Sequence, residues 1–216
     1  MITGSILLAL ALESGWGQLA DRRAEAVILA SLASELEGAR QEMLRARGVH
    51  KTRCDATTEL RGLFRQADNI DPTAIGILTR QAASVTSVDA PLGVLLGLIS
   101  SGSLDLISDA SLRSILAGWP ARLEDHREAE IYIHDVVRDQ WVPWLVAHSV
   151  LTDDWGRGDA RPPGATSART LVETLANTEF QNLVMMQDYY CSVVLSESER
   201  LEGDIQELRT RVLEHL

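Results

Sequence analysis

Residues 29–46 read LASLASELEGARQEMLRA, and this stretch decides the fold. Within it an apolar residue recurs in alternating steps of three and four, the spacing of a helix face that packs lengthwise on another helix. The residues of this seam are Leu29, Leu32, Leu36, Ala39, Met43 and Ala46. The pattern loosens at Gly48 and His50 and resumes at Leu60 and Phe64. The sequence therefore predicts one long helix in the first third of the chain.

A second seam lies at the other end of the sequence. Apolar residues with Glu and Arg between them follow heptad spacing and predict a coiled-coil-like tail over 193–216. The residues of this seam are Val194, Leu201, Ile205, Leu208 and Val212. The simplest arrangement pairs the two long helices antiparallel, and the same seams could instead pair between two chains. In either case we expect an all-α fold in which the middle helices form a small bundle.

The middle of the chain contains several helix starts. Asp71 before Pro72 is typical of an N-cap and predicts a helix over 72–84. The segment APLGVLLGLISSG (90–102) is apolar nearly all round, which predicts a buried helix, with Gly93 and Gly97 in tight packing. Asp109 is expected to cap the helix that follows.

Prolines and glycines mark the predicted interruptions. Pro120 predicts a kink or break near Trp119, and Pro143 predicts a second bend. Residues 152–168 contain three glycines and two prolines without an apolar period, which predicts a surface loop. A last long helix is expected from about Ser167 to the end of the chain.

Composition limits the classes of function. The chain has 216 residues, of which 45% are hydrophobic and 24% charged, so residues 21–216 are expected to form one helical domain after a short segment at 1–20. The formal net charge of −11 argues against a nucleic-acid partner, which needs clustered Lys and Arg. Cys54 and Cys191 match no metal or redox spacing and are interpreted as small buried residues, although a disulfide between them stays open.

The N-terminal run from Ile2 to Leu12 is apolar or small and carries no charge. A spanning helix needs about 20 such residues, so this run is too short to cross a bilayer alone. It is interpreted as part of a truncated membrane anchor, as a segment lying against a membrane or partner, or as a buried helix end. Trp16, which is followed by charged residues, resembles the border of a membrane interface. The residues expected to contact a membrane or partner are Ile6, Leu7, Leu8, Leu10 and Trp16.

One group of residues has the spacing of a metal site. His126, Glu130 and His134 are four apart, so they share one face of a helix and could converge on a cation. The surrounding stretch 124–130 is densely charged, as a solvated face would be, and no second Glu-x-x-His element completes the set. These residues are therefore weak metal candidates, and the sequence indicates neither a cofactor nor a catalytic residue.

Aromatic and sulfur-containing residues could line a pocket for a small ligand. Trp141 and Trp144 are spaced as helix-packing anchors, and this interpretation is favoured over a ligand platform. Met185 and Met186, followed closely by Tyr189 and Tyr190, are likewise interpreted as core and interface residues.

The run LLGLISSGSLDLISDASLRSILAGWPARLEDHREAE, at 95–130, resembles an uncharacterised bacterial family of helical proteins. Members begin with a single membrane-spanning helix that ends in small residues and tryptophan. They continue with a charged long helix, a segment SG.L.LI.D..LR..L..W and a C-terminal helical hairpin or coiled coil. The stretch NTEFQNLV at 177–184 resembles the start of the family's final helix, and ILLALALESGWGQLADRRAE at 6–25 resembles the end of its anchor. The resemblance implies membrane attachment and no particular activity.

These observations predict a non-enzymatic protein at the bacterial inner membrane, peripheral or anchored, with the periplasmic side preferred. It would act through protein contacts, by self-association through its seams or as a subunit of a membrane complex. One alternative is a ligand-sensing bundle with a site near Trp141, Trp144 and Tyr189. Another is a metal-dependent enzyme that uses His126, Glu130 and His134.

Overall fold

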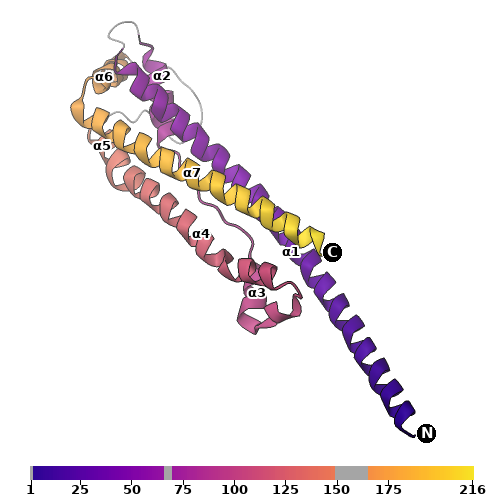
Figure 1. Cartoon of the computed structure of the whole chain (residues 1–216). Coiled ribbons are helices and arrows are strands. Elements are labelled where there is room, and N and C mark those ends of the chain that lie inside the picture. Colours follow the sequence, from indigo (N-terminus) through magenta and orange to yellow (C-terminus); the bar gives the residue numbers. More distant parts are fainter. Residues whose placement is uncertain (1, 66–69, 149–164) are drawn as a thin grey trace. The chain divides into compact units, whose positions relative to one another are not determined.

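The structure is a computed structural model that describes the backbone of residues 2–65, 70–148 and 165–216, and the side chains within 19–65, 70–148, 169–170 and 172–216. All regular elements in these ranges are helical, so the predicted all-α fold is confirmed (Figure 1). The elements are α1 (Ile2–Leu63), α2 (Pro72–Ala82), α3 (Gly93–Ser101), the 3-10 turn η1 (Ser103–Leu106), α4 (Ala110–Val136), the π-helical turn η2 (Val137–Trp141), α5 (Val142–Ala147), α6 (Ala165–Leu175) and α7 (Thr178–Glu214).

Contacts divide the chain into two compact units. Unit 1 comprises Met1–Glu42, Asp89–Arg122 and Glu202–Leu216, and unit 2 comprises Met43–Val88 and Leu123–Leu201. The helices α1, α4 and α7 each contribute to both units. The single domain expected over 21–216 stays a prediction beside this division into two units.

The predicted pairing of the two long helices is confirmed, because α1 packs against α7. The direction is antiparallel: within unit 2, Arg61 pairs with Asp188 and Arg47 with Glu199, so numbers rise along α1 as they fall along α7. The two seams are buried in this pairing within one chain. The seam residues, each at most 2% exposed, are Leu29, Leu32, Leu36, Met43, Leu201, Ile205, Leu208 and Val212.

In unit 1, carboxylates of α1 hold the segment around α3. Glu35 accepts the backbone N–H groups of Val94 and Leu95 at 2.6 and 3.0 Å, so a side chain from α1 caps the first turn of α3. Glu25 accepts both the N–H and the hydroxyl of Ser108 at 2.6 and 2.7 Å.

The apolar helix α3 is less buried than predicted. Leu95 and Leu98 are buried, whereas Leu96 is 48% exposed. A Cβ added at Gly97 would meet no atom within 4 Å, so this glycine does not mark a close helix approach. The prediction of a helix buried on all sides was wrong because unit 1 covers only one face of α3.

In unit 2 an aromatic core joins the ends of five helices. Trp141 lies 5.5 Å from Phe180 between ring centroids, and buried residues of α1, α2, α6 and α7 surround them. Asp71 caps α2 through a 2.9 Å bond from the N–H of Thr73, as predicted. Such a cap stabilises a helix by about 1 kcal/mol.

The interruptions differ in part from the predictions. Helix α4 continues through Pro120, whereas the bend predicted at Pro143 coincides with the π-helical turn η2 just before it. The predicted last helix is divided, because Asn177 accepts the N–H groups of Glu179 and Phe180 and begins α7. Most of the predicted loop at 152–168 lies outside the described residues, and α6 already begins at Ala165.

Cys54 and Cys191 form a disulfide that joins α1 to α7 in unit 2. Their Cα atoms are 5.4 Å apart, a normal separation for a disulfide, and 137 positions separate the two residues in the sequence. The interpretation of both cysteines as small buried residues was therefore incomplete: both are buried, and they are also bonded.

We expect the double variant C54A/C191A to unfold at a lower urea concentration than the oxidised wild type. Opening a loop of this length removes on the order of 5 kcal/mol by chain entropy alone, and measured values are commonly about 2–4 kcal/mol. Urea titration of both proteins, with and without reductant, measures the difference. Reductant should lower the urea midpoint of the wild type and leave that of the double variant unchanged. A wild-type midpoint that is the same with and without reductant contradicts the expectation.

Candidate functional site

Four titratable side chains are buried together in unit 2. They are His50 and Arg53 on α1 and His126 and Glu130 on α4, and none of them is more than 3% exposed. Arg and Glu are almost never fully buried unless they are paired. This cluster is therefore the most unusual chemical feature among the described residues.

The helix seams bring these residues together. On α1 the steps of three and four do not loosen at Gly48; they continue through His50, Arg53 and Thr57 to Leu60, and all four are 0% exposed. Polar residues thus occupy seam positions for two turns of the helix. The sequence contained a signal for this cluster: the spacing of the seam continues through polar residues. An interpretation that considers apolar residues alone does not detect it.

Arg53, His50 and Glu130 form a continuous chain of hydrogen bonds. A guanidinium nitrogen of Arg53 lies 2.8 Å from Nδ1 of His50, and Nε2 of His50 lies 3.1 Å from Oε1 of Glu130. Arg53 can only donate, so Nδ1 of His50 accepts and the proton of this imidazole is assigned to Nε2. A neutral histidine thereby links a buried cation to a buried carboxylate.

The same groups hold an extended segment of the chain, residues 84–88, which we call the strap. Glu130 accepts the N–H of Val88 at both carboxylate oxygens, at 3.0 and 3.2 Å. Arg53 donates to the carbonyl of Ser84 at 3.1 Å. His134 donates from Nε2 to the carbonyl of Thr86 at 2.8 Å. Side chains of α1 and α4 thus supply partners for backbone groups that no helix satisfies.

His126 is the incomplete member of the cluster. Its side chain is buried, and neither ring nitrogen has a hydrogen-bond partner. Its Nε2 lies 3.5 Å from Oε1 of Glu130, the oxygen that already accepts from His50 and Val88. The imidazole of His126 is therefore close to the Glu130 carboxylate but not hydrogen-bonded to it, and a small shift of either side chain would form the bond.

Burial sets the protonation of the cluster. It lowers the pKa of both His50 and His126 below the ordinary histidine value, because a charge is poorly solvated there. Arg53 adds to this effect at His50, whereas Glu130 opposes it at both imidazoles. Burial also lowers the pKa of the Arg53 guanidinium to about 10, which leaves it charged at neutral pH.

The predicted metal residues are only partly brought together. His126 and Glu130 meet as expected, but His134 points to the strap and His50 takes its place. Because Nε2 of His50 carries the proton, it has no lone pair for a cation. Within the described ranges, no group of three or more His, Cys, Asp or Glu residues is arranged to hold a metal ion.

The residues of the predicted ligand site lie in two places. Trp141 and Trp144 pack on Phe180 in the aromatic core. Tyr189 lies nine residues further along α7, about 13 Å by helical rise, in edge contact with Tyr190. The tyrosines thus belong to an outer surface, where Tyr132 of α4 stacks on Tyr190 at 6.1 Å between ring centroids.

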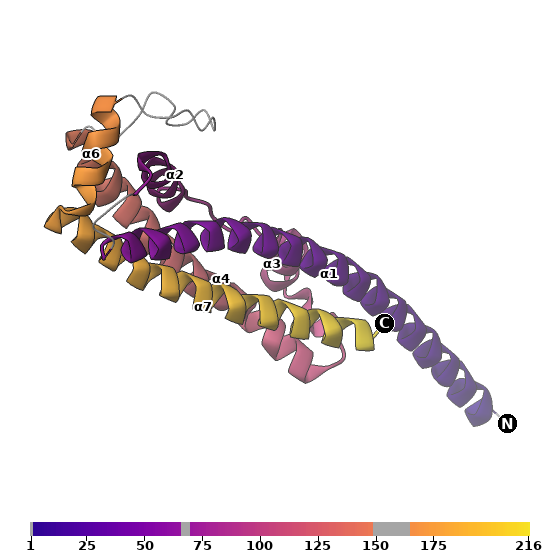
Figure 2. The same cartoon turned by 90° about the horizontal axis from the view of Figure 1, so that it is seen from above.

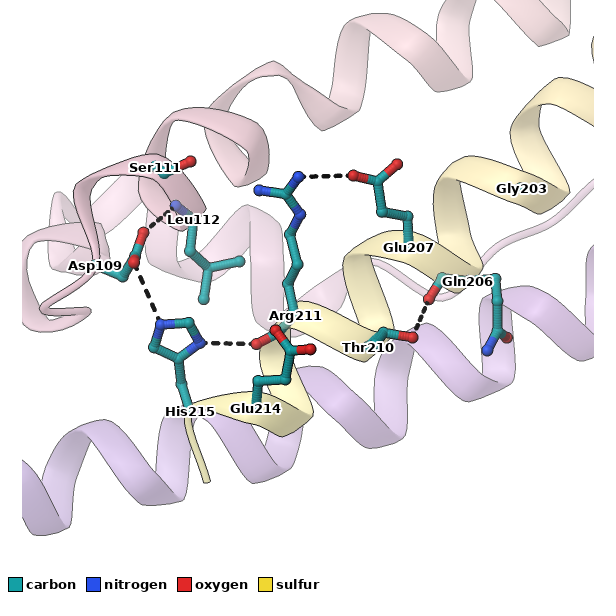
Figure 3. Close-up of a pocket in the computed structure, with 10 residues that line it drawn as sticks. All are labelled: Asp109, Ser111, Leu112, Gly203, Gln206, Glu207, Thr210, Arg211, Glu214 and His215. Atoms are coloured by element: carbon teal, nitrogen blue, oxygen red, sulfur yellow. Dashed lines mark hydrogen bonds and ion pairs between the residues drawn. The ribbon is translucent and has the colours of Figure 1, made fainter.

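Unit 1 contains a hollow of about 620 Å³ between the start of α4 and the end of α7 (Figure 3). Four of its charged residues form two pairs: His215 bonds Asp109 at 3.2 Å, and Arg211 bonds Glu207 at 2.7 Å. The backbone carbonyl of Arg211, together with Asp109, raises the pKa of His215. This hollow is a surface groove whose lining includes two ion pairs.

Neither a protein-family profile, nor a curated protein, nor a solved structure matches this chain.

Replacing Glu130 by leucine should destabilise the protein by about 3–5 kcal/mol, because Arg53 would remain as an unpaired buried cation. The double variant R53L/E130L should recover much of this loss. Urea unfolding measures the four free energies of the double-mutant cycle.

The matched control is E128L, since Glu128 is exposed on the same helix and should change stability by no more than about 0.5 kcal/mol. Equal losses for E128L and E130L would show that the cluster has no special importance for stability.

The free energy of unfolding should fall as the pH drops below about 6.5. In that range the unfolded chain binds protons at His50 and His126 while the folded chain, with its lowered pKa values, does not. The loss continues down to the folded pKa values, at up to about 1.4 kcal/mol per pH unit for each histidine. Urea titrations at several pH values measure the slope.

The variant H126L should reduce that slope and raise stability at low pH. H148Q changes an exposed histidine of the same unit and should keep the wild-type slope. His215, with its raised pKa, acts in the opposite direction, because its contribution is lost as the pH rises. A slope unchanged in H126L would contradict the assignment.

Proposed function

We propose that this protein is a non-enzymatic helical protein of the bacterial inner membrane, attached there by the N-terminal part of α1. It acts through protein contacts, with a second copy of itself or as a subunit of a membrane complex. The resemblance of residues 6–25 and 95–130 to a bacterial family with a membrane-spanning N-terminal helix supports this proposal.

The observation that carries the proposal is the exposure of α1 at residues 19–24. All six residues are exposed, and six residues cover more than a full helical turn, so no face of the helix is covered there. Among the side chains of α1 that the structure describes, which begin at residue 19, the first buried one is Leu29. The helix is continuous from Ile2, and in both views its N-terminal end runs on past the end of α7 within unit 1 (Figures 1 and 2).

The apolar run 2–12 therefore lies on a part of α1 that precedes the packed bundle of unit 1. Ile6, Leu7, Leu8, Leu10 and Trp16, the residues predicted to contact a membrane, belong to this part, and their side chains lie outside the described ones. Across the described ranges, no helix combines the length and the apolar character that crossing a bilayer requires.

The disulfide supports the periplasmic side. Disulfides persist in oxidising compartments, of which the bacterial periplasm is one, and are rare in the cytosol. An acidic chain of net charge −11 is compatible with translocation, because the positive-inside rule concerns Lys and Arg in short loops.

The outer surface of unit 2 supports the contact part of the proposal. Tyr132 and Tyr189 are 55% and 64% exposed, and both contact Tyr190. Met185, one helical turn before Tyr189 on α7, is half exposed. Tyrosine and methionine are enriched at protein interfaces. Since the seams are buried within one chain, contacts between chains are expected on this surface rather than along the seams.

Fractionation of host cells followed by carbonate extraction tests the attachment. The wild type should sediment with the membranes, and retention after carbonate distinguishes an anchored protein from a peripheral one. The variant L7E/L10E should move to the soluble fraction, because two carboxylates oppose insertion at about 2–4 kcal/mol each.

The matched control is L19E/V27E, which introduces the same charges at exposed apolar positions of α1. It should sediment like the wild type. A wild-type protein that is soluble before carbonate treatment contradicts the proposal.

A further inference from the structure

The strap connects α2 to the segment before α3, and charged side chains fasten it. Arg45 donates to the hydroxyl of Thr86 and the carbonyl of Ser87, at 3.2 and 3.1 Å. Arg53 and His134 hold the carbonyls of Ser84 and Thr86, as described above. Glu130 accepts the N–H of Val88, and it does so with the carboxylate that lies beside His126.

We propose that the buried cluster is a proton-operated latch on the strap. A proton taken up at Nε2 of His126 turns the Glu130 carboxylate toward the new imidazolium and weakens its hold on the N–H of Val88. The inference concerns unit 2 alone and goes beyond the proposed membrane attachment.

The geometry places one carboxylate oxygen between three nitrogens. Oε1 of Glu130 is 3.0 Å from the nitrogen of Val88, 3.1 Å from Nε2 of His50 and 3.5 Å from Nε2 of His126. While His126 is neutral, this third distance is not bridged by a hydrogen bond. Once protonated, His126 becomes a charged donor, so the carboxylate meets a full positive charge there and only the partial charge of an amide at Val88. The carboxylate then gains more from His126 than from Val88.

The charges that face His126 come from three helices. His50 on α1 opposes a positive charge on His126, whereas Glu130 on its own helix and Glu197 on α7 favour it. Arg53 on α1 acts on His50. Glu197 is itself paired with Arg200, at 2.9 Å. His134 acts on His50 rather than directly on His126. The strap contributes only backbone groups and hydroxyls to these contacts.

Desolvation is the largest influence on His126 and lowers its pKa, so the latch opens below the ordinary histidine range. Glu37 of unit 1, whose pKa is lowered to about 2 by its bonds with Arg40 and Gln41, still carries its charge at such a pH.

Amide hydrogen exchange on the ¹⁵N-labelled full chain tests the latch. The protection of Val88, corrected for intrinsic exchange, is divided by that of Leu60, a buried residue of α1 in the same unit. This ratio should fall by about tenfold or more in the wild type as the pH is lowered from about 7.5 to about 4, which extends below the ordinary histidine range. The ¹⁵N shifts of the His126 ring should move to the protonated values over the same pH range.

Two variants separate the latch from general destabilisation. H126Q retains a polar side chain of similar size that takes up no proton, so its ratio should stay constant over the same pH range. H148Q removes an exposed histidine of unit 2 and should behave as the wild type. A constant ratio in the wild type, or an equal fall in H126Q, overturns the proposal.

If H126Q does not fold, the Val88 ratio and the His126 ring shifts of the wild type alone test the latch. A His126 ring that stays neutral while the Val88 ratio falls also overturns the proposal. These results are independent of membrane attachment, because they are obtained on the purified chain.

Discussion

Backbone groups outside helices must find partners, and in this protein carboxylates of neighbouring helices supply many of them. The connection from α2 to α4 contains the short elements α3 and η1 and, at 83–92, the longest described run without regular structure. In unit 1, Glu25 and Glu35 of α1 accept its N–H groups, and in unit 2 Glu130 of α4 accepts another. A buried N–H left unpaired costs about 1–3 kcal/mol. The N–H groups that Glu35 and Glu130 accept are partly buried, so these two carboxylates help to fix where the connection lies. The acidic character of the long helices is thus partly structural.

This constraint explains why a charged cluster is tolerated inside unit 2. Placing Glu130 where it reaches Val88 buries a negative charge, which needs a nearby cation. Arg53 supplies that cation, and His50 links it to Glu130 by hydrogen bonds. A second guanidinium nitrogen of Arg53 donates to the carbonyl of Ser84. Replacing such a network by apolar residues often leaves the free energy of unfolding unchanged or raises it. The charged network therefore serves to specify one arrangement of the chain rather than to add stability. Here that arrangement is the path of the strap between α1 and α4.

The sequence predicted the fold well because apolar seams repeat over many turns. Leu29 to Ala46 and Leu201 to Val212 are long enough to define a helix face, and both faces are buried as expected. The cluster was only half predicted, since His126 and Glu130 were identified as one helix face without their partners on α1. Their contact with His50 depends on how α1 packs against α4. A local sequence pattern does not predict this packing. The spacing of the seam could nevertheless have predicted the α1 partners. His50, Arg53 and Thr57 continue the steps of three and four between Ala46 and Leu60.

The disulfide and the cluster act on the same part of α1 in different ways. Cys54 follows Arg53 directly and ties α1 to α7, whereas the cluster connects α1 to α4 and to the strap. A covalent bond does not respond to a change of pH in the histidine range, but a hydrogen bond to a carboxylate does. Protonation of the cluster therefore leaves α1 and α7 joined and acts on the strap, which has no covalent tie of its own. A local opening of this kind needs less free energy than unfolding of the unit, because the aromatic core around Trp141 and Phe180 stays packed.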